Sequence, residues 1–236
     1  MMRRFCAGIV LTMVSFGLAQ NTPAIAPDHS SHTPSQAKPS AEEVWTNLMA
    51  GNSRFVSGRP KTRDLIPLRQ KLASGQSPDV IILSCSDSRV PPELIFDQSL
   101  GDIFVVRTAG NVADPVALGS IEYAVDHIHS PLLVVLGHQK CGAVSAACSG
   151  EKMPSTNLDA IMKKIDPAVS RAKAHKADDL IESAIKENIH QSAEDVLANS
   201  EIVRNAVKAH ELTVMEAEYE FDTGKVVRLN PGVGNN

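Results

Sequence analysis

Residues 80–89 read VIILSCSDSR, and residues 132–142 read LLVVLGHQKCG. Each stretch opens with a short run of apolar, mostly β-branched or leucine residues, which is typical of a strand buried on both faces. Each then continues into residues that bind metals, Cys85 in the first stretch and His138 and Cys141 in the second. We therefore predict two strands of a parallel sheet, with the three side chains just past the carboxyl ends, where ligand sites of such sheets gather.

Two thiolates and one imidazole are a ligand set typical of zinc. Three protein ligands leave one tetrahedral position open, which is the layout of a catalytic rather than a structural zinc site. Buried free cysteines and a hydrogen-bonded core histidine are common individually, but their joint occurrence favours a metal. We predict one Zn²⁺ per subunit, held by Cys85, His138 and Cys141.

Asp87 and Arg89 follow the first cysteine at two-residue intervals. Asp87 is close enough to reach the metal itself, and Arg89 can hold its carboxylate with a bidentate fork. A surface ion pair is the plain alternative, but beside a metal ligand a functional role is favoured. The pair predicts a switch: while Arg89 holds Asp87, water keeps the fourth position on zinc, and when the pair opens, Asp87 takes that position as a fourth ligand and closes the site.

These motifs and their separation resemble those of the β-class carbonic anhydrases. The resemblance covers roughly residues 41–230 and includes the segments 75–78, 104–111, 121–124 and 219–225. It implies an α/β fold with a mostly parallel sheet flanked by helices, with C-terminal helices and an edge hairpin. It also implies a homodimer or a dimer of dimers, in which the amino-terminal helix packs on a partner subunit.

The resemblance implies the reversible hydration of CO₂ to bicarbonate and a proton by attack of zinc-bound hydroxide, with Asp87 and Arg89 as catalytic residues. It assigns Gln76 to a hydrogen bond with CO₂ or bicarbonate and Gly142 to a backbone site beside the zinc. Phe104 and Tyr123 match aromatic wall positions, part of each pocket coming across a dimer interface. From the residues alone, a capped turn and ordinary core packing are the alternatives.

One departure concerns a second, regulatory bicarbonate site. Relatives that have this site use a tryptophan three residues before the first cysteine ligand, where this chain has Ile82. Arg107 matches another residue of that regulatory pocket, but the missing aromatic side chain argues against regulation by bicarbonate. Steep, cooperative inhibition by bicarbonate would contradict this expectation.

Two other functions remain open. A hydrolase of carbon disulfide or carbonyl sulfide uses the same fold and the same zinc chemistry, with a more restricted route to the metal. A non-catalytic, zinc-stabilised oligomeric binding protein is the second alternative, although structural zinc has no use for Asp87, Arg89 and Gln76.

The first residues are typical of a secretory signal peptide, because Met1-Met2-Arg3-Arg4 precedes an apolar run from Phe5 to Leu18. An uncleaved membrane anchor is the alternative. We predict a signal peptide over residues 1–19, a flexible linker over 20–40, a zinc-dependent catalytic domain over 41–230 and a disordered tail over 231–236. The enzyme is expected in the periplasm, or secreted as the second choice, without stable membrane insertion once the signal is removed.

The chain of 236 residues, 43% of them hydrophobic, is long enough for one sizeable core. Its formal net charge of −4 and the lack of a Lys/Arg-rich stripe argue against a nucleic-acid partner. Three cysteines remain once Cys6 leaves with the signal, and this odd number argues against a disulfide framework. Cys148 is then expected to be a buried, inert thiol rather than a fourth zinc ligand.

Helical periodicity appears in several segments. It covers Glu42–Phe55, with Ser40 as cap and Glu43 three positions later, then Val116–Ile128, a segment from Ala143 onward, and most of residues 157–210. In the last of these, an apolar stripe is expected to lie in the core, formed by Leu180, Ile181, Ala184, Ile185 and Ile189.

Overall fold

The structure, a computed structural model, describes residues 38–230 and 232. The predicted signal peptide (1–19), most of the predicted linker (20–40) and most of the predicted tail (231–236) lie outside the described residues. Within residues 38–230, no helix combines the length and the apolar character that crossing a bilayer requires.

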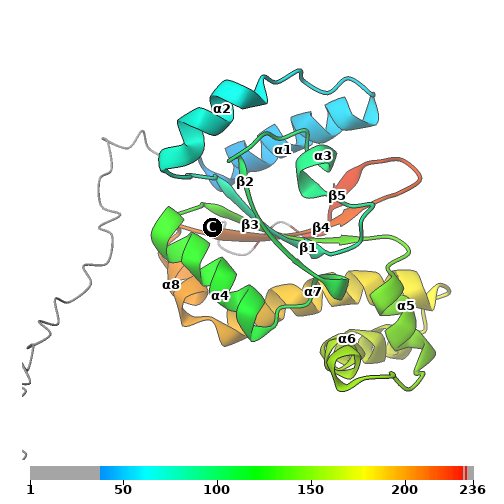
Figure 1. Ribbon diagram of the computed structural model, residues 1–236. Coiled ribbons are helices and arrows are strands. Elements are labelled where there is room, and N and C mark those ends of the chain that lie inside the picture. The colour runs from blue at the N-terminus through cyan, green and yellow to red at the C-terminus, as the bar shows by residue number, and fades with distance from the viewer. Residues whose placement is uncertain (1–37, 231, 233–236) are drawn as a thin grey trace, which may run out of the picture. The chain divides into compact units, whose positions relative to one another are not determined.

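A five-stranded sheet in the order β2-β1-β3-β4-β5 forms the centre (Figure 1). The strands are β1 (Val80–Cys85), β2 (Ile103–Thr108), β3 (Leu132–His138), β4 (Thr213–Tyr219) and β5 (Val226–Arg228). The first four run parallel, and β5 pairs antiparallel with β4 through a hairpin. Every residue of β1, β3 and β4 is buried, as expected of strands covered on both faces. The predicted mostly parallel sheet with an edge hairpin is therefore confirmed.

Helices cover both faces of the sheet (Figure 1). One face carries α1 (Ala41–Val56), α2 (Leu65–Lys71) and α3 (Pro92–Ile95), and the other carries α4 (Pro115–Tyr123), α5 (Gly142–Ser149), α6 (Thr156–Ala174), α7 (Leu180–Asn199) and α8 (Glu201–Lys208). Short helical turns are η1 (Leu72–Ser74), η2 (Ala109–Asn111) and η3 (Ala124–Ile128). The long helical region predicted over 157–210 is thus three helices, each begun by a side-chain cap, from Ser155, Asp179 and Ser200 respectively.

The amino-terminal helix begins as its sequence predicts. The Ser40 side chain accepts a hydrogen bond from the backbone N–H of Glu43, and the Glu43 carboxylate accepts one from the backbone N–H of Ser40. This reciprocal capping box satisfies two backbone donors at the start of α1. The helix then buries Val44, Trp45 and Leu48 in the core.

Helix α7 packs unusually close to β3. A Cβ atom at Gly137 would lie 2.4 Å from Cγ1 of Ile189, so only glycine permits this approach one residue before the end of the strand. Ala184, Ile185 and Ile189 are buried as predicted. The prediction for Ile181 is wrong: its side chain is 40% exposed, because the first turn of α7 borders a surface groove instead of the sheet.

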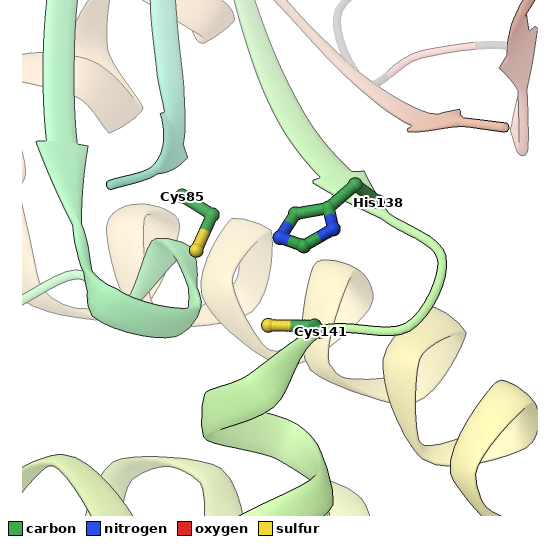
Figure 2. Close-up of side chains that lie close together, drawn as sticks. All are labelled: Cys85, His138 and Cys141. Atoms are coloured by element: carbon green, nitrogen blue, oxygen red, sulfur yellow. The ribbon is translucent and has the colours of Figure 1, made fainter. Parts of the chain in front are cut away.

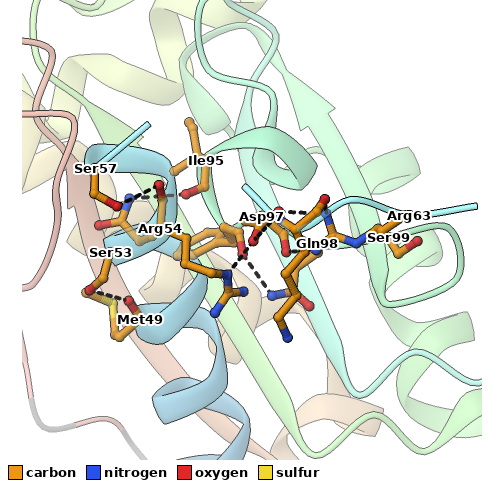
Figure 3. A network of polar contacts seen from close by, with 12 residues as sticks. Met49, Ser53, Arg54, Ser57, Arg63, Ile95, Asp97, Gln98 and Ser99 are labelled. Atoms are coloured by element: carbon orange, nitrogen blue, oxygen red, sulfur yellow. Dashed lines mark hydrogen bonds and ion pairs between the residues drawn. The ribbon is translucent and has the colours of Figure 1, made fainter. Parts of the chain in front are cut away.

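A buried ion-pair network joins α1 to the loop after α3 (Figure 3). The Asp97 carboxylate accepts hydrogen bonds from Nε of Arg54, from Nη1 of Arg63 at 2.6 Å and from the backbone N–H of Lys61 at 3.2 Å. Arg63 Nη2 also donates to the backbone carbonyl of Asp97. We call these four residues the Asp97 network. It fixes the segment that precedes α2 against the core.

Candidate metal centre

The three predicted metal ligands converge at the carboxyl edge of the sheet (Figure 2). Cys85 is the last residue of β1 and His138 the last residue of the neighbouring β3, so they end the strands rather than follow them. Cys141 caps α5 after a tight turn. The ligand atoms of all three lie within 4.8 Å of one another. Ligand atoms around one tetrahedral zinc would be about 3.5–3.8 Å apart, so only a small contraction is needed.

The turn between His138 and Cys141 contains a strained residue. Lys140 has a φ of +52°, in the left-handed region that non-glycine residues rarely adopt. This conformation turns the chain back so that Cys141 faces His138. The backbone N–H of Gln139 donates to the carbonyl of Tyr219 at 3.1 Å, which fixes the turn to β4. Strain of this kind concentrates at functional sites.

The hydrogen bonds of His138 define its tautomer. Nδ1 lies 2.7 Å from the carbonyl oxygen of Gln139, and because a carbonyl only accepts, Nδ1 carries the proton. Nε2 then presents a lone pair. It is buried and has no hydrogen-bond partner among the described residues. A buried acceptor without a partner is costly, and a cation between Nε2 and the two sulfurs would remove that cost.

A backbone donor faces the sulfur of Cys85. The N–H of Gly110 lies 3.3 Å from Sγ, with Gly110 at a φ of +70° and with no room for a Cβ, which would lie 2.8 Å from Ile165. The Asn188 side chain donates to the Gly110 carbonyl at 2.8 Å and so holds this turn from α7. Sequence reasoning assigned Gly110 no role; a glycine two residues past the end of β2 was the available signal.

Among the protein groups alone, the two thiols shift each other's pKa in opposite directions. The Cys141 thiol, aided by the backbone N–H groups of Asp87 and Gly110, lowers the pKa of Cys85 to about 4 against the opposing effect of burial. The Cys85 sulfur and burial together raise the pKa of Cys141. A divalent cation bound here would supply the charge that lets both sulfurs lose their protons.

Asp87 and Arg89 form the predicted bidentate pair. Nε and Nη2 of Arg89 donate to the two carboxylate oxygens of Asp87 at 2.9 and 2.7 Å. These bonds hold the pKa of Asp87 at about 2. Oδ2 of Asp87 lies 3.9 Å from Nε2 of His138, which places the carboxylate beside the ligand group. This is the arrangement predicted for the open site, with Arg89 gripping Asp87.

Arg107 braces the loop that carries these residues. It donates from Nε to the carbonyl of Cys85 at 2.9 Å and from Nη2 to the carbonyl of Asp87 at 2.6 Å. Sequence reasoning missed this role, because a partner that is a backbone carbonyl leaves no mark in the sequence. Ile82, where relatives with a regulatory bicarbonate site have tryptophan, lies fully buried inside β1.

Solved structures share this fold. A β-carbonic anhydrase of Sordaria macrospora, described as tetrameric, is 26% identical with a TM-score of 0.65, covering 81% of this chain and 96% of that one. The β-carbonic anhydrase of Coccomyxa, solved with acetazolamide, is 27% identical with a TM-score of 0.63, covering 74% and 90% of the two chains.

Sequence relatives agree with the structures. The carbonic anhydrase family profile matches residues 80–226. Carbonic anhydrase 2 of Mycobacterium tuberculosis is 38% identical over 196 residues, which are 81% of this chain and 94% of the relative. The chain belongs to the β-class carbonic anhydrases. Carbonic anhydrase of Mycolicibacterium smegmatis is 36% identical over 190 residues, 78% of this chain and 90% of the relative.

The predicted pocket residues of this β-class carbonic anhydrase lie in two places. Gly142 begins α5 directly beside Cys141. Gln76 is exposed in the loop before β1, at the opposite end of that strand from Cys85. Phe104 pairs with a residue four positions before Cys85, about 13 Å away along the sheet. It lies beside Tyr123, at 6.3 Å between ring centroids. A single chain therefore does not bring Gln76, Phe104 and Tyr123 to its own metal ligands.

Cys148 is only half-buried, so its prediction as a buried thiol is wrong. It lies in the second turn of α5 and borders the surface groove near Ile181. Burial nevertheless raises the pKa of its thiol. Among the described residues the ligand group contains Cys85, His138 and Cys141 without Cys148, so it is not a fourth ligand in this structure.

Proposed function

We propose that this chain catalyses the reversible hydration of CO₂ to bicarbonate and a proton, with one zinc ion per subunit held by Cys85, His138 and Cys141. The observation that carries the proposal is the convergence of three buried ligands around an unpartnered Nε2, with an Arg89-held carboxylate beside them. Zinc bound there would supply the Lewis acidity that makes water a nucleophile near neutral pH.

The protein groups have separate tasks in this reaction. His138 and the two cysteines fix the ion, and the carbonyl of Gln139 keeps Nε2 of His138 free to bind it. Asp87, ionised at working pH because its pKa is about 2, can only accept hydrogen bonds. It therefore accepts one from the reacting water and turns a lone pair of that water toward CO₂. Arg89 keeps the carboxylate from taking the water's place.

A second subunit completes the pocket in this proposal, as a homodimer or a dimer of dimers. Gln76, Phe104 and Tyr123 lie away from their own metal centre, and a partner can place them over the other subunit's centre. Apolar side chains that a partner would cover include Val116, which is 78% exposed, and Leu94, which is 65% exposed. Light scattering on the zinc-loaded protein should give at least a dimer; a monomer with full activity would contradict this assembly.

Stopped-flow CO₂ hydration by the zinc-loaded protein tests the function. Asp87→Ala and Arg89→Ala should each lose most activity, roughly 100-fold, because the water loses its orientation or its position is taken by Asp87. Zinc content should stay at one per subunit. Asp159→Ala, which removes an exposed carboxylate of α6, serves as the control and should match the wild type. Loss of zinc together with activity would show that Asp87 and Arg89 are a structural pair.

CO₂ hydration, measured together with sulfide release and zinc-dependent stability, separates the alternative functions. Sulfide release from carbon disulfide or carbonyl sulfide, without a CO₂ hydration rate, would favour the sulfur hydrolase. Zinc-dependent stability with neither activity would favour the non-catalytic binding protein. Neither alternative is favoured by the relatives, which are named carbonic anhydrases.

A further inference from the structure

One aromatic ring contacts both working parts of the metal centre. The guanidinium carbon of Arg89 lies 4.2 Å from the ring centroid of Phe221. The imidazole of His138 meets the same ring edge-on, at 5.5 Å between centroids and 77° between planes. Phe221 thus touches the side chain that holds Asp87 and the side chain that binds the metal.

The ion pair of Arg89 and Asp87 needs such support. The Arg89 side chain is 53% exposed, and exposed ion pairs hold their geometry weakly because water competes for both partners. A ring packed on the flat face of a guanidinium leaves its edge N–H groups free to donate. Phe221 can therefore restrict Arg89 to one plane while Nε and Nη2 still bind Asp87.

Phe221 is itself fixed to the turn that carries the metal ligands. Its backbone N–H donates to Oε1 of Gln139 at 3.2 Å, and the backbone N–H of Gln139 donates to the carbonyl of Tyr219 at 3.1 Å. The ring of Tyr219 packs edge-on against Phe221, at 5.4 Å between centroids. These contacts therefore join the hairpin to the His138 turn.

The other side of the hairpin is held by α1. The buried side chain of Asn52 donates to the carbonyl of Gly224 at 3.0 Å and accepts from the backbone N–H of Val226 at 3.0 Å. It also donates to the carbonyl of Ile95 at 3.1 Å. With its amide satisfied on three backbone groups, Asn52 sets the position of the hairpin, and hence of Phe221, relative to the core.

We propose that Phe221 is a positioning residue that holds Arg89 on Asp87 and so keeps the metal centre in its open arrangement. The inference rests on the proposed function, since the open arrangement is the one that leaves room for the reacting water. Without the ring, Arg89 samples other rotamers in solvent, Asp87 is released and the closed arrangement gains population. The hairpin thereby acts on the site without touching the substrate.

Phe221→Leu tests the proposal because it removes the ring and keeps an apolar side chain. We expect zinc content to be unchanged and kcat/KM for CO₂ hydration to fall by at most about fivefold, because the loss of a partly exposed cation–π contact shifts the equilibrium between the open and closed arrangements by about that factor. A crystal structure of the zinc-loaded variant should show Arg89 turned away and Asp87 on the metal. The visible spectrum of the cobalt-substituted protein should change with that ligand exchange. Phe221→Tyr keeps the ring and should behave as the wild type.

Control variants distinguish a positioning role of Phe221 from a general disturbance of the structure. Phe55→Leu removes a ring of α1 that packs on Tyr219 of the hairpin but not on Arg89. This variant should leave the spectrum unchanged. In an Arg89→Ala background, Phe221→Leu should add no further spectral change. If Phe221→Leu does not fold, Phe221→Met, whose unbranched side chain adapts to the available space, replaces it.

Two results would overturn the proposal. One is a Phe221→Leu structure with Arg89 still on Asp87 and the wild-type cobalt spectrum. The other is an equal spectral change with and without Arg89, which would place the effect of the ring on His138. If the wild type fails to hydrate CO₂, the proposed function falls, while the structure and the spectrum still decide the role of Phe221.

Discussion

The chain contains two buried polar clusters that differ in whether their polar groups have hydrogen-bond partners. In the Asp97 network, both carboxylate oxygens receive donors from two arginines and a backbone N–H. At the metal centre, Nε2 of His138 has no partner among the described residues, and the two thiols shift each other's pKa in opposite directions. The first cluster is complete within the protein. A cation would complete the second.

A lowered pKa does not distinguish the two clusters. The carboxyl groups of Asp97 and Asp87 both have a pKa of about 2, in each case because arginine side chains donate to them, for Asp97 against an opposing effect of burial. The clusters differ in what remains unpaired. An unmet hydrogen-bond requirement therefore separates the metal centre from the Asp97 network, whereas a shifted pKa does not.

The largest expected effect comes from removing a ligand. A four-ligand zinc site contributes roughly 10–16 kcal/mol, so Cys141→Ser should weaken zinc binding by about 4 kcal/mol, close to a thousandfold. Competition with a chelator, followed by metal analysis, measures this loss of zinc affinity. The free energy of unfolding without metal should barely change, because serine fits the space of cysteine. Cys148→Ser is the matched control and should bind zinc normally. An equal loss of zinc affinity in both variants would contradict the assignment of Cys141 as a ligand.

A smaller effect is expected at the complete cluster. Asp97→Asn leaves Arg54 and Arg63 without their anion and should lower the free energy of unfolding by about 3 kcal/mol, measured in urea. Zinc affinity should not change. Because folding lowers the pKa of Asp97, its contribution is present above pH 4 and is lost as pH falls from about 4 to about 2. The variant should lack that acid dependence. Asp159→Asn, an exposed carboxylate, is the control, and a zinc defect in Asp97→Asn would show that the clusters are coupled.

Local signals in the sequence predicted those features of the fold and of the metal centre that depend on one segment of the chain. The apolar runs gave β1 and β3, parallel strands brought Cys85 and His138 to one edge, and Ser40 with Glu43 marked the start of α1. Each of these needs only the residues of one element and the geometry of a parallel sheet. The fold class and the ligand set were accordingly predictable.

Side-chain contacts that depend on strand register or on helix docking were not predictable. Phe221 reaches His138 because β4 pairs with β3 in the register that places Tyr219 opposite His138. Arg107 and Gly110 act on backbone carbonyls or on a sulfur, and such partners leave no pattern in the sequence. Ile181 has the helical spacing of a core residue, but whether the first turn of α7 overlies the sheet depends on how the helix docks.

A third buried group, Glu218 of β4, tests how the chain handles an unmet hydrogen-bond requirement away from the metal centre. Its Oε1 is buried and has no hydrogen-bond partner among the described residues. Burial and the neighbouring Glu182 carboxylate raise the pKa of Glu218 to about 7, while Lys186 stands 4.0 Å away. Here a proton on the carboxyl group, rather than a metal, would satisfy the unpaired oxygen.

The smallest expected effect follows from that proton. A carboxyl group whose pKa rises on folding contributes stability below its unfolded pKa and loses it as pH rises through the folded value, here between about 4.5 and about 7. Glu218→Gln, which resembles the protonated form, should match the wild type near pH 5 and exceed it at pH 8 by about 1–2 kcal/mol in urea unfolding. Glu216→Gln is the matched control on the same strand, because Glu216 is paired with His190 at 3.0 Å and its loss should not stabilise. A pH-independent difference between Glu218→Gln and the wild type would contradict the titration of Glu218 over this pH range.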